Sequence, residues 1–98
     1  MKVDVHAQGF TLTPAITEHA ERRLRFALKH AADQVRQVTV RLADVNGPRG
    51  GIDKKCSVHI MLNGVPDIVT EDTEADMYIA INRAIDRVGR TVLRRMAH

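Results

Sequence analysis

The hydrophobic residues of this sequence recur at two different spacings, and the order of these spacings along the chain restricts the fold. A spacing of two, typical of a strand with one buried face, occurs over 2–8, 35–45, 54–62 and 65–71. Spacings of three and four, typical of an amphipathic helix, occur over 14–31 and 74–96. The predicted order is therefore β-α-β-β-β-α, an α+β fold with a single sheet and both helices packed on one face.

The alternation also predicts which strand side chains are buried. In the second and third strands the inward-facing residues are expected to be Val38, Val40, Leu42, Cys56, Val58, Ile60 and Leu62. Asn63-Gly64 is a strong hairpin turn before the fourth strand, and Pro66 near the start of that strand favours an edge position or an end of the ladder. The segment NGPRGG at 46–51 is predicted to be a flexible loop.

The first helix is predicted from its beginning and from its apolar face. Thr13 is a suitable N-cap, and Pro14 suits the first helical turn. The residues expected to face the core are Ile16, Ala20, Leu24, Ala27 and Ala31.

The second helix is predicted in the same way. Residues Thr73 to Asp76 resemble a capping box, with an aspartate where glutamate or glutamine is usual. Gly89 lies beside the expected buried stripe, where a missing side chain would let the two helices approach closely. The residues of that stripe are Tyr78, Ile81, Ile85, Val88 and Val92.

Length and composition exclude several classes of protein. A chain of 98 residues has enough sequence for one hydrophobic core, so 1–98 is predicted to be a single domain. No run of about 18 apolar residues is present, and the N-terminus lacks the apolar centre of a secretion signal. Together with the single cysteine, Cys56, this predicts a cytoplasmic protein without a disulfide. Three aromatic residues are too few for the stacking platform of many single-strand binders.

Charge is distributed unevenly along the last third of the chain. Residues 66–76 hold five acids and no base, whereas residues 77–98 hold five arginines and one acid, Asp86. On a helical wheel, one row of arginines falls nearly opposite the predicted buried stripe: Arg83, Arg87, Arg90 and Arg94. No acid lies on this arginine ridge, and arginine suits bidentate recognition of phosphate better than lysine does. The ridge is either a solvated helix face or a phosphate-binding surface.

The first helix has a weaker basic face. Arg22, Arg25 and Lys29 project away from its apolar side, and Arg23 lies on the flank. Two basic helices side by side would form a broad positive surface suited to the backbone of a folded RNA.

Three segments make the chain similar to a known family. They are TPAI at 13–16, RRL at 22–24 and, most specifically, DMYIAINRAIDRVGR at 76–90. In these segments the sequence resembles the ribosome hibernation promoting factors, a family that includes the ribosome-associated inhibitor A proteins. The resemblance covers nearly the whole chain and agrees with the predicted order of strands and helices.

The resemblance implies both a fold and a function. Members of the family are similar in fold to double-stranded-RNA-binding domains. They bind the small ribosomal subunit in the channel for messenger and transfer RNA, and thereby silence idle ribosomes. The residues that the resemblance places against ribosomal RNA are Arg23, Arg87, Arg90 and Arg94. Phe26 stands where the family usually has a lysine, so Arg25 and Lys29 are expected to supply that charge, and Arg83 is added from its place on the ridge.

The resemblance is to the short form of the family, because no second domain follows. Long members use an additional C-terminal domain to pair ribosomes. Whether this chain promotes pairing through a helper factor or holds single ribosomes idle stays open.

The other motifs support no different chemistry. Cys56 and His59 are three residues apart in a predicted strand and point to opposite faces, so no metal site is expected. Nothing places a nucleophile beside a base in a predicted pocket, so no enzyme activity, cofactor or small-molecule substrate is expected. A second hypothesis is a protein-interaction module of the same fold, in which the acidic patch at 71–76 docks a basic partner.

Overall fold

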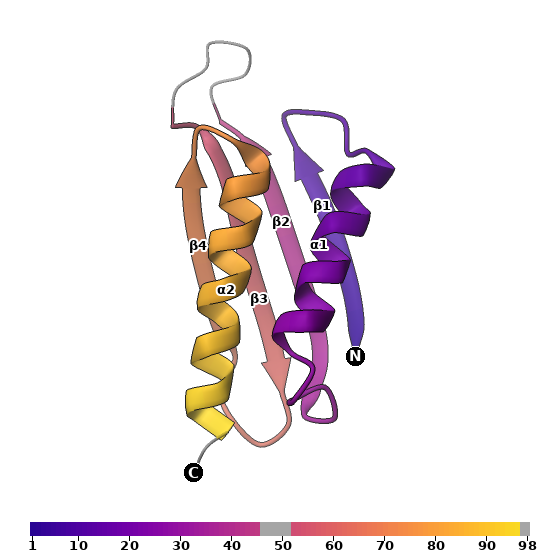
Figure 1. Ribbon diagram of the computed structural model, residues 1–98, viewed down its shortest axis with the longest axis vertical. Coiled ribbons are helices and arrows are strands. Elements are labelled where there is room, and N and C mark those ends of the chain that lie inside the picture. The colour runs from indigo at the N-terminus through magenta and orange to yellow at the C-terminus, as the bar shows by residue number, and fades with distance from the viewer. Residues whose placement is uncertain (46–51, 97–98) are drawn as a thin grey trace.

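The computed structural model describes residues 1–45 and 52–96, and its elements follow the predicted order (Figure 1). They are β1 (Lys2–Gln8), α1 (Pro14–Ala27), β2 (Val35–Asp44), β3 (Lys54–Leu62), β4 (Ile68–Glu74) and α2 (Met77–Met96). The loop predicted at 46–51 lies outside the described residues. Neither helix within these described ranges combines the length and hydrophobicity that crossing a bilayer requires.

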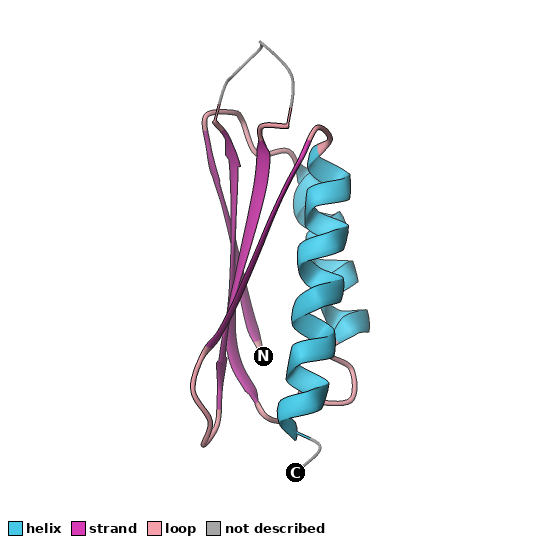
Figure 2. Ribbon diagram, turned by 90° about the vertical axis from the view of Figure 1, so that its left-hand side faces the viewer, coloured by secondary structure: helices cyan, strands magenta, loops and turns pink. Residues whose placement is uncertain are grey.

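The strands form one sheet in the order β1-β2-β3-β4. β1 is parallel to β2, because α1 returns the chain to the same end of the sheet, whereas β2 and β4 each pair with β3 in antiparallel fashion. β4 is an edge strand, one of the two alternatives that Pro66 favoured, and Pro66 itself precedes the strand. Both helices cover the same face of the sheet and leave the other face free of helices (Figure 2). The predicted α+β fold is therefore confirmed.

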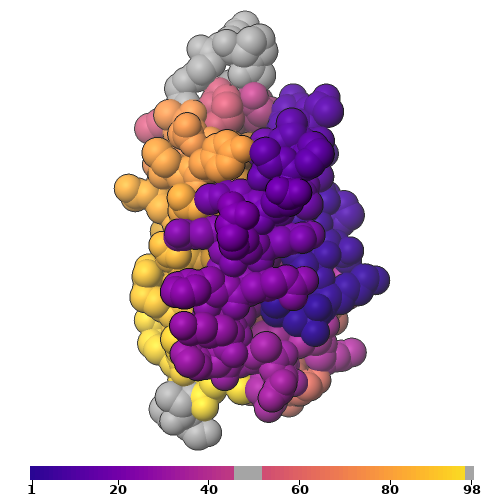
Figure 3. All heavy atoms as spheres, turned by 45° about the vertical axis from the view of Figure 1, so that its right-hand side comes forward, coloured from indigo at the N-terminus to yellow at the C-terminus, as the bar shows by residue number. Residues whose placement is uncertain are grey.

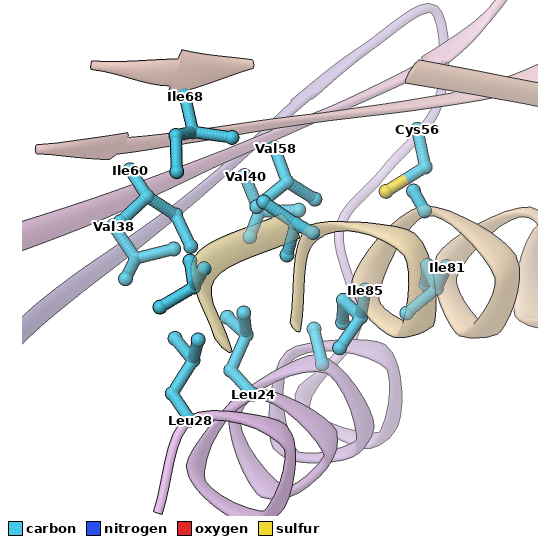
Figure 4. Close-up of a cluster of buried hydrophobic side chains, with 14 of the residues drawn as sticks. Leu24, Leu28, Val38, Val40, Cys56, Val58, Ile60, Ile68, Ile81 and Ile85 are labelled. Atoms are coloured by element: carbon cyan, nitrogen blue, oxygen red, sulfur yellow. The ribbon is translucent and has the colours of Figure 1, made fainter. Parts of the chain in front are cut away.

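The hydrophobic core lies between the sheet and the two helices (Figure 4). Every inward-facing residue predicted for β2 and β3 is buried, and Leu24 of α1 packs against them. The α2 residues buried as predicted are Ile81, Ile85, Val88 and Val92. Each such side chain contributes about 1.5–3 kcal/mol when it leaves water. Thr70 of β4 is also buried, and its hydroxyl donates to the backbone carbonyl of Ala84 at 2.9 Å, which ties the edge strand to α2.

The first helix is shorter than predicted. Thr13 is its N-cap, as expected, with Oγ1 accepting a hydrogen bond from the N–H of Ile16 at 3.3 Å. The helix ends at Ala27 rather than at position 31, and the N–H of Leu28 donates to the carbonyl of Leu24 at 2.9 Å. Ala31 is nevertheless buried, in the turns that follow the helix. The apolar spacing continues past the end of the helix, and for this reason the predicted end was wrong.

The boundary between β4 and α2 also differs from the prediction. The strand spans Ile68–Glu74 instead of 65–71, because its pairing with β3 continues as far as the pair of Lys54 and Glu74. The strand therefore includes Thr73 and Glu74, which the prediction had assigned to the start of the helix.

Asp76 is the residue that begins α2. Its carboxylate accepts hydrogen bonds from the N–H of Tyr78 at 2.8 Å and from that of Ile79 at 3.2 Å, so Asp76 is the N-cap. The predicted capping box, with Asp76 inside the helix, is wrong. Tyr78 is also not part of the buried stripe: it is 40% exposed, because it lies on the flank toward α1, where its ring meets the edge of His19 at 5.0 Å between centroids.

Candidate nucleic-acid interface

The two helices run parallel to each other and are joined by a seam of matched residues. His19 Nε2 lies 2.7 Å from Asn82 Oδ1, and one turn further along each helix Arg23 Nη2 donates to Asp86 Oδ1 at 2.8 Å. Near the end of α1, Gly89 faces Ala27 so closely that a Cβ at position 89 would lie 3.2 Å from the Cβ of Ala27. The close approach predicted from Gly89 is thus confirmed, and Figure 3 shows α1 in front with α2 beside it.

The arginine ridge lies on the solvent side of α2, as the wheel predicted. Its side chains are all exposed, whereas the opposite side of the helix is packed on the sheet. The structure nevertheless divides the predicted RNA-binding residues into two groups, those held by acids and those without an ionic partner.

Arg87 and Arg83 belong to the first group, because α2 packs beside the acidic edge strand. Arg87 donates from Nη1 to the backbone carbonyl of Glu71 at 2.7 Å and from Nη2 to Asp72 Oδ2 at 3.2 Å. Arg83 Nε lies 3.8 Å from Glu74 Oε2. The helix itself supplies no acid to the ridge, but β4 does, so the inference that the ridge is not neutralised was wrong for these two arginines.

Arg23 also has an acidic partner. Its guanidinium is bound to Asp86, the one acid of the last 22 residues, and the Arg23 side chain is 37% exposed. The ion pair joins α1 to α2 on the outer surface, where both side chains are partly exposed. Asp86 was identified from the sequence as the one acid among the arginines of the second helix, but its pairing with Arg23 was not predicted. The isolated position of this acid among arginines could have suggested such a pair.

The second group lies toward the C-terminal ends of both helices. Its members are Arg22 and Arg25 from α1, Lys29 from the turn that follows α1, and Arg90 and Arg94 from α2, and we call it the open basic surface. All are exposed, and none forms an ion pair with any residue in 1–45 or 52–96. Arg94 donates only to Thr91 Oγ1, at 3.3 Å, and Lys29 Nζ lies 4.6 Å from the centroid of the Phe26 ring.

The acids at 71–76 do not form a free acidic patch. Glu71 pairs with Lys55 at 3.2 Å, Asp72 pairs with Arg87 at 3.2 Å, and Glu74 lies near Arg83. Asp76 caps α2. Each of these carboxylates therefore already has a cation or a pair of helix N–H groups as its partner.

Residues with metal or nucleophilic chemistry lie away from the helical surface. Cys56 is buried on the inner face of β3, and burial, aided by the nearby Asp72 carboxylate, raises the pKa of its thiol to about 12. His59 lies on the opposite face, with Nε2 2.8 Å from Asp67 Oδ2, as expected for positions three apart in a strand. Within the described ranges no three histidine, cysteine or acidic residues are grouped to hold a metal ion.

Comparison with known proteins agrees with this fold. Residues 3–97 match the model of the family described as sigma 54 modulation protein / S30EA ribosomal protein. A ribosomal subunit interface protein from Coxiella burnetii has a similar structure, with a TM-score of 0.84 and 17% identity over 100% of both chains. The N-terminal domain of Thermus thermophilus Protein Y is also similar, with a TM-score of 0.79 and 23% identity over 96% of this chain and 98% of that chain. No curated protein sequence matches the chain significantly.

Proposed function

Because the chain belongs to the family of sigma 54 modulation proteins and S30EA ribosomal proteins, which includes the ribosome hibernation promoting factors, we propose that it silences ribosomes by binding the small subunit. Residues 1–98 act as one ribosome-binding domain. The two helices contact ribosomal RNA, and the body of the domain fills the channel that messenger and transfer RNA would occupy.

The observation that carries this proposal is the open basic surface. Its cations extend from solvent-exposed positions on two helices whose packing on the sheet fixes their relative placement. On α2 the open basic surface extends from Arg90 to Arg94, roughly 6 Å at the standard helical rise. A preformed row of cations without acidic partners can displace counterions from RNA phosphates without first breaking its own ion pairs.

The proposed mechanism needs no catalysis. Arginines bind phosphate oxygens, which fixes the position of the domain but reads no sequence. Silencing then follows from occlusion, because the folded body and the other ligands of the channel exclude one another.

The predicted RNA-binding residues have different expected roles. Arg90 and Arg94, with Arg25 and Lys29, make the primary phosphate contacts. Arg23, Arg83 and Arg87 contribute after phosphate replaces a carboxylate as their partner, so their contributions are smaller.

The competing hypothesis, a protein-interaction module that uses the acids at 71–76, has less support. Those carboxylates are engaged within the domain, and a basic partner would have to displace Lys55, Arg83 or Arg87 from them. The competing hypothesis makes a different prediction: binding to the partner would be lost when Glu71, Asp72 and Glu74 are neutralised.

Co-sedimentation with purified small ribosomal subunits tests the proposal. The informative variant is Arg90→Glu/Arg94→Glu, because reversing Arg87 would also break its bonds to β4 and confuse folding with binding. Arg41→Glu is the matched control, since Arg41 is exposed in β2 on the face without helices. We expect the wild type and Arg41→Glu to pellet with subunits and the double variant to remain in the supernatant. Retained pelleting of a correctly folded double variant would refute the proposal.

A further inference from the structure

Phe26 is the most exposed aromatic side chain of the protein. It is 70% exposed, compared with 40% for Tyr78, and Phe10 is partly buried. Phe26 is not needed for the core, because the buried side of α1 is formed by Ala20 and Leu24. Exposure alone is common for single apolar side chains, so it is the surroundings of the ring that indicate a ligand.

One cation lies over the ring, and others are exposed on the same helix and on its neighbour. Lys29 Nζ lies 4.6 Å from the ring centroid, a distance at which an ammonium is attracted to the face of an aromatic ring. Arg22 and Arg25 are exposed on the same helix. Arg90 is at the same level on α2, because Ala27 and Gly89, the chain neighbours of Phe26 and Arg90, are in contact across the seam. The ring is thus part of the open basic surface.

We propose that Phe26 stacks on an unpaired nucleobase of the RNA that the open basic surface binds; this inference rests on the proposed function. Aromatic rings flanked by cations are the groups that receive splayed-out bases of single-stranded loops and bulges, while the cations hold the adjoining phosphates. With Lys29 on one face of the ring, the other face receives the base. The protein has too few aromatic residues for a platform of successive stacks, and one exposed ring provides a single stack.

A nucleobase fits this site better than the apolar side chain of a protein partner does. The centres of protein–protein interfaces are depleted of charged residues, and lysine in particular. Here the ring carries an ammonium on its face, and exposed arginines lie on the same helix. A nucleotide can bind to the ring and to an arginine at once, because its base stacks while its phosphate pairs with the guanidinium.

Two substitutions at position 26 separate stacking from simple apolar contact. Phe26→Tyr keeps the aromatic face. Phe26→Leu keeps a large apolar side chain but removes the aromatic face. Val69→Ala is the matched control, because Val69 is 61% exposed in β4, on the face of the sheet away from the helices. The affinity of each protein for small ribosomal subunits is measured over a range of salt concentrations, and thermal unfolding confirms that each variant folds.

We expect Phe26→Leu to weaken binding by about 5-fold to 150-fold, the usual effect of losing one base–aromatic stack. The slope of log K against log salt should be unchanged, because no phosphate contact is lost. Phe26→Tyr and Val69→Ala should bind like the wild type.

The other outcomes distinguish a failure of the stacking assignment from a failure of the proposed function. Equal binding by Phe26→Leu and the wild type would overturn the stacking assignment and leave the proposed function intact. A wild type that does not bind subunits at any salt concentration would overturn the proposed function, and the stacking assignment with it.

Discussion

Arg87 of α2 donates a hydrogen bond from its guanidinium to the backbone carbonyl of Glu71 at 2.7 Å, and so connects the last helix to the edge strand of the sheet. A second bond, to Asp72 Oδ2 at 3.2 Å, holds the same side chain. An arginine that the family resemblance assigns to RNA is therefore also a structural residue of the domain.

We expect Arg87→Gln to lower the free energy of unfolding by about 1 kcal/mol, since hydrogen bonds of a half-exposed charged group are partly replaced by water. Urea denaturation measures the effect. Arg90→Gln is the control, because Arg90 forms no hydrogen bond or ion pair with the residues that the structure describes. Equal stability of the two variants would show that the bonds to β4 contribute nothing.

Removal of Asp86 should strengthen binding to the ribosome. Asp86→Asn removes a negative charge from the outer surface of the helices and releases Arg23 from its ion pair. We expect a higher affinity for small subunits and a salt slope that is steeper by up to about one, at a cost of at most about 1 kcal/mol in stability. The measurement is a salt titration of subunit binding. Asp67→Asn, which makes the same change of charge beside His59, should leave the affinity unchanged, and weaker binding by Asp86→Asn would contradict this role.

Lys54 should be far more important to stability than its neighbour Lys55. Lys54 Nζ lies 2.8 Å from Asp53 Oδ1 and 3.2 Å from Asp44 Oδ2, and Asp53 is completely buried. Lys54→Met leaves the buried Asp53 carboxylate without its cation, so we expect a clear loss of stability. Adding Asp53→Asn should restore part of it. Lys55→Met breaks an exposed pair with Glu71 and should cost less than about 1 kcal/mol by urea denaturation.

Leucine at position 89 should separate the helices. A Cβ at Gly89 already lies 3.2 Å from the Cβ and 3.4 Å from the carbonyl oxygen of Ala27, so a longer side chain must push α1 away from α2. We expect Gly89→Leu to destabilise the domain by about 1–3 kcal/mol despite the better helix propensity of leucine. The second variant, Ala27→Gly in the Gly89→Leu background, should recover part of the loss. Thermal unfolding of the three proteins decides between this contact and a purely local effect.

Stability should fall at alkaline pH because of Cys56. Burial raises the pKa of the thiol from 9.0 to about 12, so the folded state keeps the proton while the unfolded state loses it. The stabilisation is complete below pH 9.0 and is lost as the pH rises toward about 12. Relative to the wild type, Cys56→Val should show a weaker decline of the free energy of unfolding over this pH range.

The burial of Cys56 can also be tested by chemical labelling. At pH 8 a thiol reagent should label the native protein only as fast as the protein opens, and rapid labelling would contradict the burial.

The sequence predicted the strands better than the ends of the helices, for a physical reason. Alternation in β2 and β3 corresponds directly to the two faces of the sheet, so Val40 and Val58 were placed correctly. The end of α1 was missed because Ala31 is buried in a turn and extends the helical spacing. The start of α2 was missed because Asp76 was assigned to the third helical position, although its carboxylate caps the first turn.

The candidate site was predicted only in part. Helical geometry was sufficient to place Arg90 and Arg94 on the solvent side. The partners of Arg87 depend on which strand lies beside α2, and that pairing joins residues 15 and 16 positions apart through the packing of the whole sheet. No local pattern contains this information. Phe26 was left out of the predicted apolar face of the first helix, and the structure places it in solvent.

The parallel arrangement of the helices also distributes unpaired charge unevenly along the longest dimension of the molecule, 45 Å. The acids of β4, paired with cations, and the first turn of α2 lie at one end, while the C-terminal halves of both helices, with the unpaired cations of the open basic surface, lie toward the other (Figure 1). In the field of a large polyanion such a molecule experiences a torque as well as an attraction. It therefore arrives with its basic end leading, which raises the fraction of encounters that are productive and makes the association rate, and not only the affinity, sensitive to salt.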